Sequence, residues 1–250
     1  MSMALHFYAR NSFATFINLR NSHSACKQFR RWESSKTRRP DGALVVEHTP
    51  AATAPRHAPV PLVFVGSSEL EGDGGAFLSL GGRLSAEAAS RGFMSYQFDL
   101  PLRTHTSGSG LIVMDRLAST LRTLIRETGI PFPPILYAGQ LSCLIAQTYV
   151  SSHPSYALIL DSPPFSCASL SNWPGLAERL PLPLPEFTFE PKFPVLVLER
   201  KSAGGVLKTS RLVKEGADYA ETCENATDVE SRNVPTTSLA VQQWIDELGC

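Results

Sequence analysis

Short apolar runs alternate with longer segments of helical periodicity from residue 61 onward. The apolar runs, rich in β-branched and aromatic residues, span residues 62–65, 94–98, 135–138, 157–160 and 195–198. Runs of this length, bounded by Pro, Gly or Asp, are typical of strands that are buried on both faces. Helical patterns span residues 77–90, 111–128 and 141–152. This alternation predicts an α/β fold with a mostly parallel, doubly wound sheet and helices on both faces.

The segments around this regular region predict smaller elements. Residues 41–59 hold a short apolar run and then Pro- and Ala-rich spacing, which indicates a peripheral strand and a linker. Beyond the last strong strand we expect a helix at residues 207–214, a weak strand at 218–223 and an amphipathic helix at 238–248. The Pro- and Leu-rich stretch 162–193 predicts a short lid segment. The length of 250 residues is consistent with one domain, which we place at residues 60–250.

The first 40 residues differ in composition from the rest of the chain. Their only acidic residue is Glu33, whereas the basic residues are Arg10, Arg20, Lys27, Arg30, Arg31, Lys36, Arg38 and Arg39. Arg-rich, Ser-rich and acid-poor N-termini are typical of mitochondrial transit peptides. Residues 1–40 are therefore interpreted as a transit peptide or disordered basic arm, with cleavage expected between Trp32 and Glu33. The expected location is the mitochondrial matrix; the alternative is a basic arm that touches RNA or a membrane surface.

Charge and cysteine content narrow the classes of partner and cofactor. The chain has 23 basic and 23 acidic residues, so removing the basic arm leaves a mildly acidic domain, which argues against a nucleic-acid partner. No apolar run approaches the roughly eighteen residues of a membrane span, so none is expected. Five cysteines without a C-x-x-C pair favour reduced thiols over disulfides or a zinc site. No phosphate-binding glycine motif is present. The sequence predicts no cofactor and no metal.

Three segments, taken in this order, carry a family resemblance. The run Pro61-Leu-Val-Phe-Val-Gly66 resembles the strand and turn before the oxyanion loop of the α/β-hydrolase family, although the frequent histidine is absent. The sequence Phe-Asp-Leu-Pro that ends at residue 101 is similar to the family's D-x-P-G segment. Residues 136–146 resemble the nucleophile elbow and the helix after it. The resemblance covers residues 61–248 and implies the α/β-hydrolase fold.

The elbow departs from the family at the nucleophile. A sharp strand-to-helix turn needs small residues two positions before and after the nucleophile, and here these are Ala138 and Ser142. Gln140 stands between them, and an amide side chain cannot form an acyl-enzyme. No histidine follows His153 in the chain, and Asn233 occupies the approximate place of the catalytic histidine. The resemblance therefore implies a catalytically degenerate member of the family.

Several residues remain as fallback catalytic candidates. These are Ser142, Cys143, Asp161 and His105, with Glu199 as a further candidate for a retained triad acid near Lys201. Placing the nucleophile at Ser142 or Cys143 would put larger residues at the two crowded positions of the turn. A buried small residue is the ordinary interpretation of Cys143, and a solvated surface side chain that of His105.

The sequence leads to one principal functional hypothesis and two alternatives. The principal one is a noncatalytic binding or assembly component of mitochondria, which binds an apolar or acyl small molecule or a protein partner. The ligand-binding residues would be Gly66, Ser67, Gln140 and Leu141. One alternative is an active serine or cysteine esterase, thioesterase or acyltransferase with an atypical constellation. The other is a subunit of a mitochondrial complex that uses the Pro-rich lid as its contact surface. Whether the Gln140 amide binds a ligand or plugs the site is open.

Overall fold

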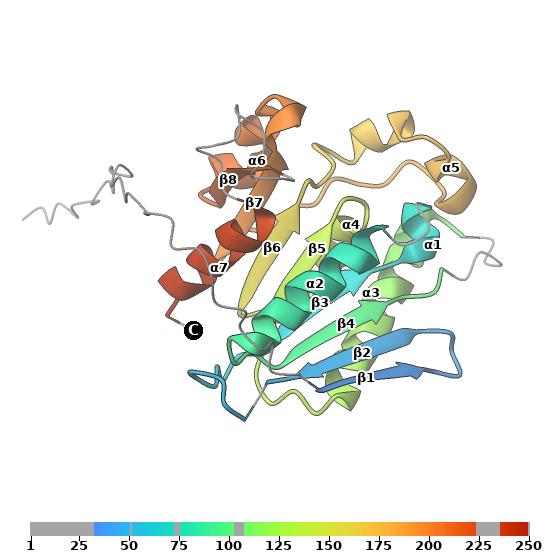
Figure 1. Cartoon of the computed structure of the whole chain (residues 1–250). Helices are drawn as coiled ribbons and strands as arrows, with labels where there is room; N and C mark the ends of the chain where they lie inside the picture. Colours follow the sequence, from blue (N-terminus) through green and yellow to red (C-terminus); the bar gives the residue numbers. More distant parts are fainter. Residues whose placement is uncertain (1–32, 51, 73–75, 103–107, 224–235, 250) are drawn as a thin grey trace, which may run out of the picture.

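The computed structural model describes residues 33–50, 52–72, 76–102, 108–223 and 236–249, which build one sheet with helices on both of its faces (Figure 1). The strands are β1 (Glu33–Arg38), β2 (Leu44–Thr49), β3 (Leu62–Gly66), β4 (Ser95–Asp99), β5 (Ile135–Gly139), β6 (Ala157–Asp161), β7 (Val195–Arg200) and β8 (Asp218–Thr222). The α-helices are α1 (Ser68–Glu71), α2 (Ala76–Ser90), α3 (Gly110–Glu127), α4 (Ser142–Val150), α5 (Leu176–Arg179), α6 (Arg211–Lys214) and α7 (Thr237–Glu247). Short 3-10 helices are η1 (Ala168–Asn172), η2 (Lys201–Ala203) and η3 (Val206–Thr209).

The eight strands follow the order β1-β2-β4-β3-β5-β6-β7-β8. β1 pairs with β2 and β2 with β4 in antiparallel fashion, and all other neighbours are parallel. The chain begins its parallel part at β3 in the middle of the sheet and adds strands outward on both sides. The expectation of a mostly parallel, doubly wound sheet is confirmed.

Successive side chains of the central strands belong alternately to two separate hydrophobic cores. In β3, Val63 and Val65 belong to the core that also contains the apolar faces of α3 and α4. Leu62 and Phe64, which alternate with them, belong to the second core, under α2 and α7. Because successive side chains of a strand point to opposite faces, a strand buried on both faces must be apolar throughout. This is why the sequence of β3 has no polar position.

The first strand was not expected from the sequence. β1 lies within the stretch assigned to the basic arm, yet it pairs with β2 along its whole length, from Glu33 opposite Thr49 to Arg38 opposite Leu44. All six of its side chains are exposed, so it has no apolar face and gives no strand signal. Polar and charged side chains are the usual protection of an edge strand against further pairing. Residues 1–32 lie outside the described residues, and the transit peptide stays a prediction.

Other elements agree with the sequence apart from their boundaries. The weak strand expected at residues 218–223 is β8, and the amphipathic helix expected at 238–248 is α7. The helix expected at residues 207–214 is instead divided into η3 and α6, because Ser210 has an extended ψ of 159°. The expected short lid is the connection between β6 and β7, which contains only η1 and α5.

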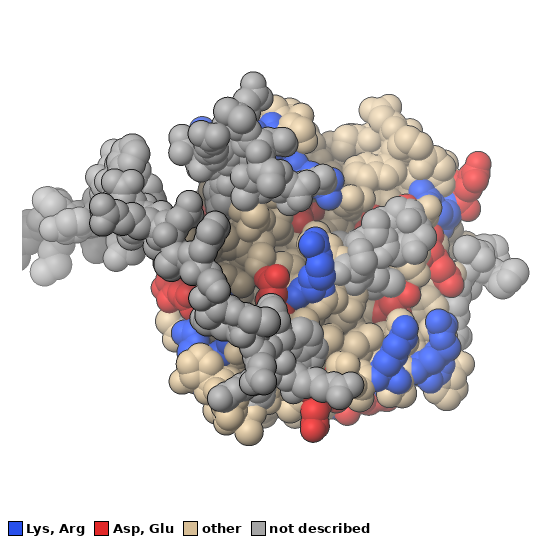
Figure 2. Space-filling model, in the orientation of Figure 1, with Lys and Arg blue, Asp and Glu red and all other residues tan. Residues whose placement is uncertain are grey.

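Two features of the described residues concern membranes and charge. None of the described helices is both long and apolar enough to cross a membrane. On the face shown in Figure 2, basic and acidic side chains of the described residues lie interspersed among uncharged ones. Interspersed charge gives no broad positive field on that face of the kind that attracts nucleic acid.

A buried histidine makes the stability of the sheet depend on pH. His48 in β2 is 7% exposed, and neither ring nitrogen has a hydrogen-bond partner among the residues that the structure describes. Burial lowers the pKa of His48 below its ordinary value of 6.5. The unfolded chain therefore binds a proton more readily than the folded one. The stability is complete above pH 6.5 and falls as the pH drops below it, by at most about 1.4 kcal/mol per pH unit.

We expect His48→Val to remove this part of the pH dependence. The measurement is the free energy of unfolding in urea at pH 7.5 and 5.5. The same substitution at the exposed His57 should leave the difference between the two pH values unchanged. An equal slope in wild type and His48→Val would contradict the assignment to His48.

Candidate functional site

The turn between β5 and α4 is strained at Gln140. Its φ is 47°, and Gln140 and Ser162 are the two non-glycine residues with positive φ in the described part of the chain. The left-handed conformation costs an ordinary residue roughly 1–2 kcal/mol. Ala138 and Ser142, two residues before and after it, are fully buried, which leaves room only for small side chains. The geometry is that of a nucleophile elbow with Gln140 at its apex.

The Gln140 side chain contributes no hydrogen bond to this turn within the described residues. It is half-buried, and within the described residues its amide has no hydrogen-bond partner. The backbone N–H of Gln140 donates to the carbonyl of Asp161 at 2.8 Å, which fixes the turn against β6. The amide therefore does not plug the site through contacts of its own.

A carboxylate from a distant part of the chain lies on the first turn of α4. Glu71 is buried, and its Oε1 accepts hydrogen bonds from the N–H and the hydroxyl of Ser142, both at 2.7 Å. Its Oε2 accepts from the N–H of Leu141 at 3.3 Å. The N-terminus of a helix carries free N–H groups and partial positive charge, so an anion is stabilised there. Glu71 supplies that anion from within the protein.

The short helix α1 is held so that Glu71 reaches this position. Ser68, the first residue of α1, donates its N–H and its hydroxyl to the carboxylate of Asp99, at 2.8 and 2.9 Å. Asp99 is the aspartate of the Phe-Asp-Leu-Pro segment at the end of β4. At the other end of α1, Gly72 adopts φ 70° and the guanidinium of Arg179 lies where its Cβ would stand. A side chain at position 72 would push the Arg179 guanidinium aside and would be strained at this positive φ.

Glu71 and its neighbours occupy the donors that an oxyanion hole requires. In the α/β-hydrolase arrangement these donors are the N–H after the nucleophile and an N–H of the loop after the third strand. Here the first is that of Leu141, which donates to Glu71. The N–H of Ser67, directly after β3, donates to the Ser142 hydroxyl oxygen at 3.2 Å. Both N–H groups are therefore bound within the protein.

The four residues expected to bind a ligand thus lie together, and their backbone groups have partners within the protein, whereas the Gln140 amide has none among the described residues. Ser67, Gln140 and Leu141 meet at the carboxyl ends of β3 and β5. Gly66, the last residue of β3, accepts the N–H of Leu100 at 2.8 Å. Glu71 is the functional residue that the sequence did not indicate. It lies 70 residues before Leu141, and no motif spacing connects the two.

The fallback nucleophiles are inaccessible. Ser142 is fully buried. Its hydroxyl donates a hydrogen bond to the Glu71 carboxylate and accepts one from the N–H of Ser67. Cys143 is fully buried as well, and its thiol donates to the carbonyl of Ala138 at 3.3 Å. Burial raises the pKa of Cys143 well above its usual value, and the carboxylates of Asp161 and Glu71 add to this. The thiol therefore stays protonated and unreactive.

The two candidate acids have structural partners. Asp161 accepts the Tyr137 hydroxyl at 2.6 Å and the Ser162 hydroxyl at 3.0 Å. Burial, with the carboxylate of Asp161 beside it, raises the pKa of Tyr137 well above its usual value, so the phenol remains a donor. Glu199 is buried in β7, and its Oε2 accepts the Tyr219 hydroxyl at 2.8 Å and the N–H of Leu207 at 3.0 Å.

The remaining positions do not complete a triad within the described residues. His105 and Asn233 lie outside them. Lys201 begins η2 directly after β7 and is exposed. Within the described part of the chain, no group of three His, Cys, Asp or Glu side chains is arranged to hold a metal ion.

Comparisons with known proteins identify the fold. No protein-family model and no curated protein sequence matches the chain. Among solved structures, a hormone-sensitive lipase from a metagenome library superposes with a TM-score of 0.57 at 14% identity, over 89% of each chain. An α/β serine hydrolase without a lid from Xanthomonas campestris reaches 0.50 at 15% identity, over 78% of this chain and 84% of its own. The Francisella virulence factor BioJ reaches 0.51 at 8% identity, over 87% and 84%. The protein has the α/β-hydrolase fold.

Proposed function

We propose that this protein is a noncatalytic member of the α/β-hydrolase fold that serves as a binding or assembly component. The observation that carries the proposal is the carboxylate of Glu71 on the N–H groups of Leu141 and Ser142. In acyl transfer the N–H after the nucleophile position, here that of Leu141, must face the oxygen on which negative charge develops. A fixed carboxylate at that place would repel this charge and keep the substrate carbonyl out.

The residue at the nucleophile position and the missing histidine also support a noncatalytic function. The apex of the elbow is an amide, which has no displaceable proton of suitable acidity. No histidine occurs after residue 153, so the loop after β8, where the fold carries the catalytic imidazole, contains none. Three separate parts of the hydrolytic machinery are thus missing or blocked.

The alternative function is hydrolysis or acyl transfer by an atypical constellation. Its support is the fold, since the solved structures that resemble the chain include a lipase and a serine hydrolase. A shared fold does not determine activity, because activity depends on the site. The alternative would need Ser142 or Cys143 as the nucleophile, and both are buried.

Activity assays decide between the two. We expect the purified protein to show no turnover of short p-nitrophenyl esters or acyl-thioesters above buffer, and no labelling by a fluorophosphonate. Ser142→Ala and Cys143→Ala serve as matched variants. Turnover or labelling that the wild type shows and either variant lacks would establish a nucleophile at that residue and overturn the proposal.

We further propose that the protein works in the mitochondrial matrix. The support is the basic, Ser-rich and acid-poor composition of residues 1–32. A cut between Trp32 and Glu33 would leave β1 complete, because β1 begins at Glu33. Sequencing the N-terminus of the protein isolated from cells tests this. A mature chain that starts near Glu33 is the expected result, and a cytosolic chain that retains Met1 would contradict it.

A further inference from the structure

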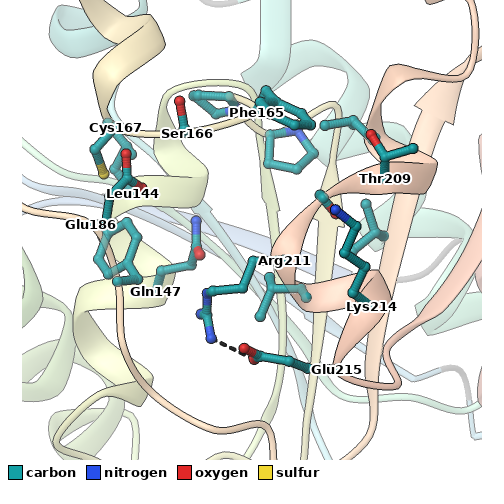
Figure 3. A pocket seen from close by; sticks show the side chains of 17 residues that line it. Leu144, Gln147, Phe165, Ser166, Cys167, Glu186, Thr209, Arg211, Lys214 and Glu215 are labelled. Atoms are coloured by element: carbon teal, nitrogen blue, oxygen red, sulfur yellow. Dashed lines mark hydrogen bonds and ion pairs between the residues drawn. The ribbon is translucent and has the colours of Figure 1, made fainter.

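A cavity lies beside α4, and the residues of the elbow apex do not line it. It has a volume of about 500 Å³, within the range of small-molecule sites, and we call it the lateral pocket. Its walls come from α4, the beginning and end of the β6–β7 connection, β7, and the segment from η3 to α6 (Figure 3). Neither Gln140 nor Glu71 lines it. The carboxylate that occupies the oxyanion donors therefore does not fill the lateral pocket.

The lateral pocket exists because no long helix covers this part of the sheet. A crossover between parallel strands ordinarily carries a helix that packs on the sheet. The connection from β6 to β7 contains only η1 and the four-residue α5, and α5 contacts α1 instead. The space next to α4 and over Val197 is left unfilled by the crossover.

The walls of the lateral pocket are mostly apolar. Leu144 of α4, Val197 of β7 and Leu207 of η3 are buried side chains that face it, and Phe187 lies on the lid side. Cys167 belongs to the same wall. Burial and the neighbouring Glu186 carboxylate raise the pKa of its thiol to about 11, so the thiol stays neutral. An aliphatic chain would gain hydrophobic free energy by covering these groups.

Two buried polar side chains in this cavity have no partner. Gln147 is 7% exposed as a residue, and its amide points into the space between the lid and α6 in Figure 3, without a hydrogen-bond partner within the described residues. The hydroxyl of Ser210 is buried and equally unpartnered. Buried polar groups are nearly always hydrogen-bonded, so a polar atom that enters this cavity would meet two side chains that lack a protein partner.

The lining carries two basic and two acidic side chains, and their positions differ. Arg211 is engaged with Glu215 and with the carbonyl of Phe189. Lys214, also on the lining, has no ion pair within the described residues. On the opposite wall Glu186 accepts the N–H of Ala168 at 2.9 Å. The cation without a partner is therefore on the α6 side, next to Ser210.

We propose that the lateral pocket binds an aliphatic carboxylate. The chain lies against Leu144, Val197 and Leu207, and the carboxylate accepts hydrogen bonds from Gln147 and Ser210 with Lys214 at the mouth. This assignment rests on the proposed noncatalytic function and gives the binding component a ligand class and a site. The proposal includes no covalent step on the ligand.

Calorimetric titration of the full chain with decanoate, decanol and decylamine at submicellar concentrations tests the proposal. We expect one decanoate per chain, weaker binding of decanol and the weakest binding of decylamine. Gln147→Leu and Ser210→Ala should each lower the affinity for decanoate by about tenfold, which corresponds to the loss of one hydrogen bond to a charged group. Gln243→Leu, the same change at an exposed position of α7, should have no effect.

The outcomes separate this proposal from the proposed function. No binding of decanoate, equal binding of the three compounds, or full affinity in both Gln147→Leu and Ser210→Ala would overturn the assignment. Urea unfolding of each variant shows whether it is folded during the titration. In parallel, p-nitrophenyl decanoate is assayed for hydrolysis. Turnover of this ester would contradict the noncatalytic function, whereas absent turnover together with absent binding would contradict the ligand assignment alone.

Discussion

Replacing Glu71 with alanine is expected to destabilise the protein by about 3 kcal/mol. The carboxylate accepts three hydrogen bonds, from the N–H and hydroxyl of Ser142 and the N–H of Leu141. All three donors are buried at the start of α4, and alanine leaves them without an acceptor. Loss of the negative charge also removes its favourable interaction with the helix N-terminus. Urea unfolding monitored by circular dichroism measures the difference.

The control for this change is Glu178→Ala. Glu178 lies in α5, is exposed, and has no hydrogen bond to the described residues, so its removal should stay within about 0.5 kcal/mol of wild type. If Glu71→Ala were as mild as the control, Glu71 would not hold the N-terminus of α4, and the blocked oxyanion donors would lose their explanation.

Replacing Trp244 with alanine is expected to cost about 3–5 kcal/mol, the usual range for a buried tryptophan. Trp244 lies in α7, is 6% exposed, and packs in the core that contains Leu62 and Phe64 of β3. Its indole N–H donates to Asp218 of β8 at 2.7 Å. One side chain therefore anchors α7 to the sheet by both apolar contact and a hydrogen bond. The free energy of unfolding in urea gives the measurement.

Two variants separate these contributions. Trp244→Phe keeps an aromatic ring and loses the indole N–H, so a smaller loss is expected. Leu239→Ala removes a side chain of the same helix that is 44% exposed, and should change the stability by less than about 1 kcal/mol. A small loss for Trp244→Ala would mean that α7 is held by other contacts.

The fold could be predicted from the sequence wherever a strand or helix has a distinctive apolar pattern. β3, β5 and β6 are buried on both faces, and their continuous apolar runs identified them. β1 is the opposite case, because all six side chains are exposed and only pairing with β2 makes it a strand. Strand formation there depends on backbone hydrogen bonds to another segment, which no periodicity records.

The candidate site, too, could be predicted only where a local sequence pattern determines the structure. The turn at Gln140 was predictable, because small residues at fixed distances from one position are a local requirement of its geometry. Glu71 was not predictable, because α1 has four residues and its contact with Ser142 joins positions that only the folded sheet brings together. Ser142 is a similar case. The sequence made it a candidate nucleophile, but in the folded protein its hydroxyl is hydrogen-bonded to Glu71 and Ser67.

The carboxylate of Glu71 also bears on how this chain could change over evolutionary time. A serine at position 140 alone would not create a hydrolase, because the Leu141 N–H that it needs is bound to Glu71 and the Ser67 N–H is bound to the Ser142 hydroxyl. Freeing those donors removes a buried anion that stabilises α4, so the substitution that unblocks the site is harmful before it is useful. Stability and reactivity compete for the same N–H groups. A path from this chain to a hydrolase therefore passes through a less stable intermediate.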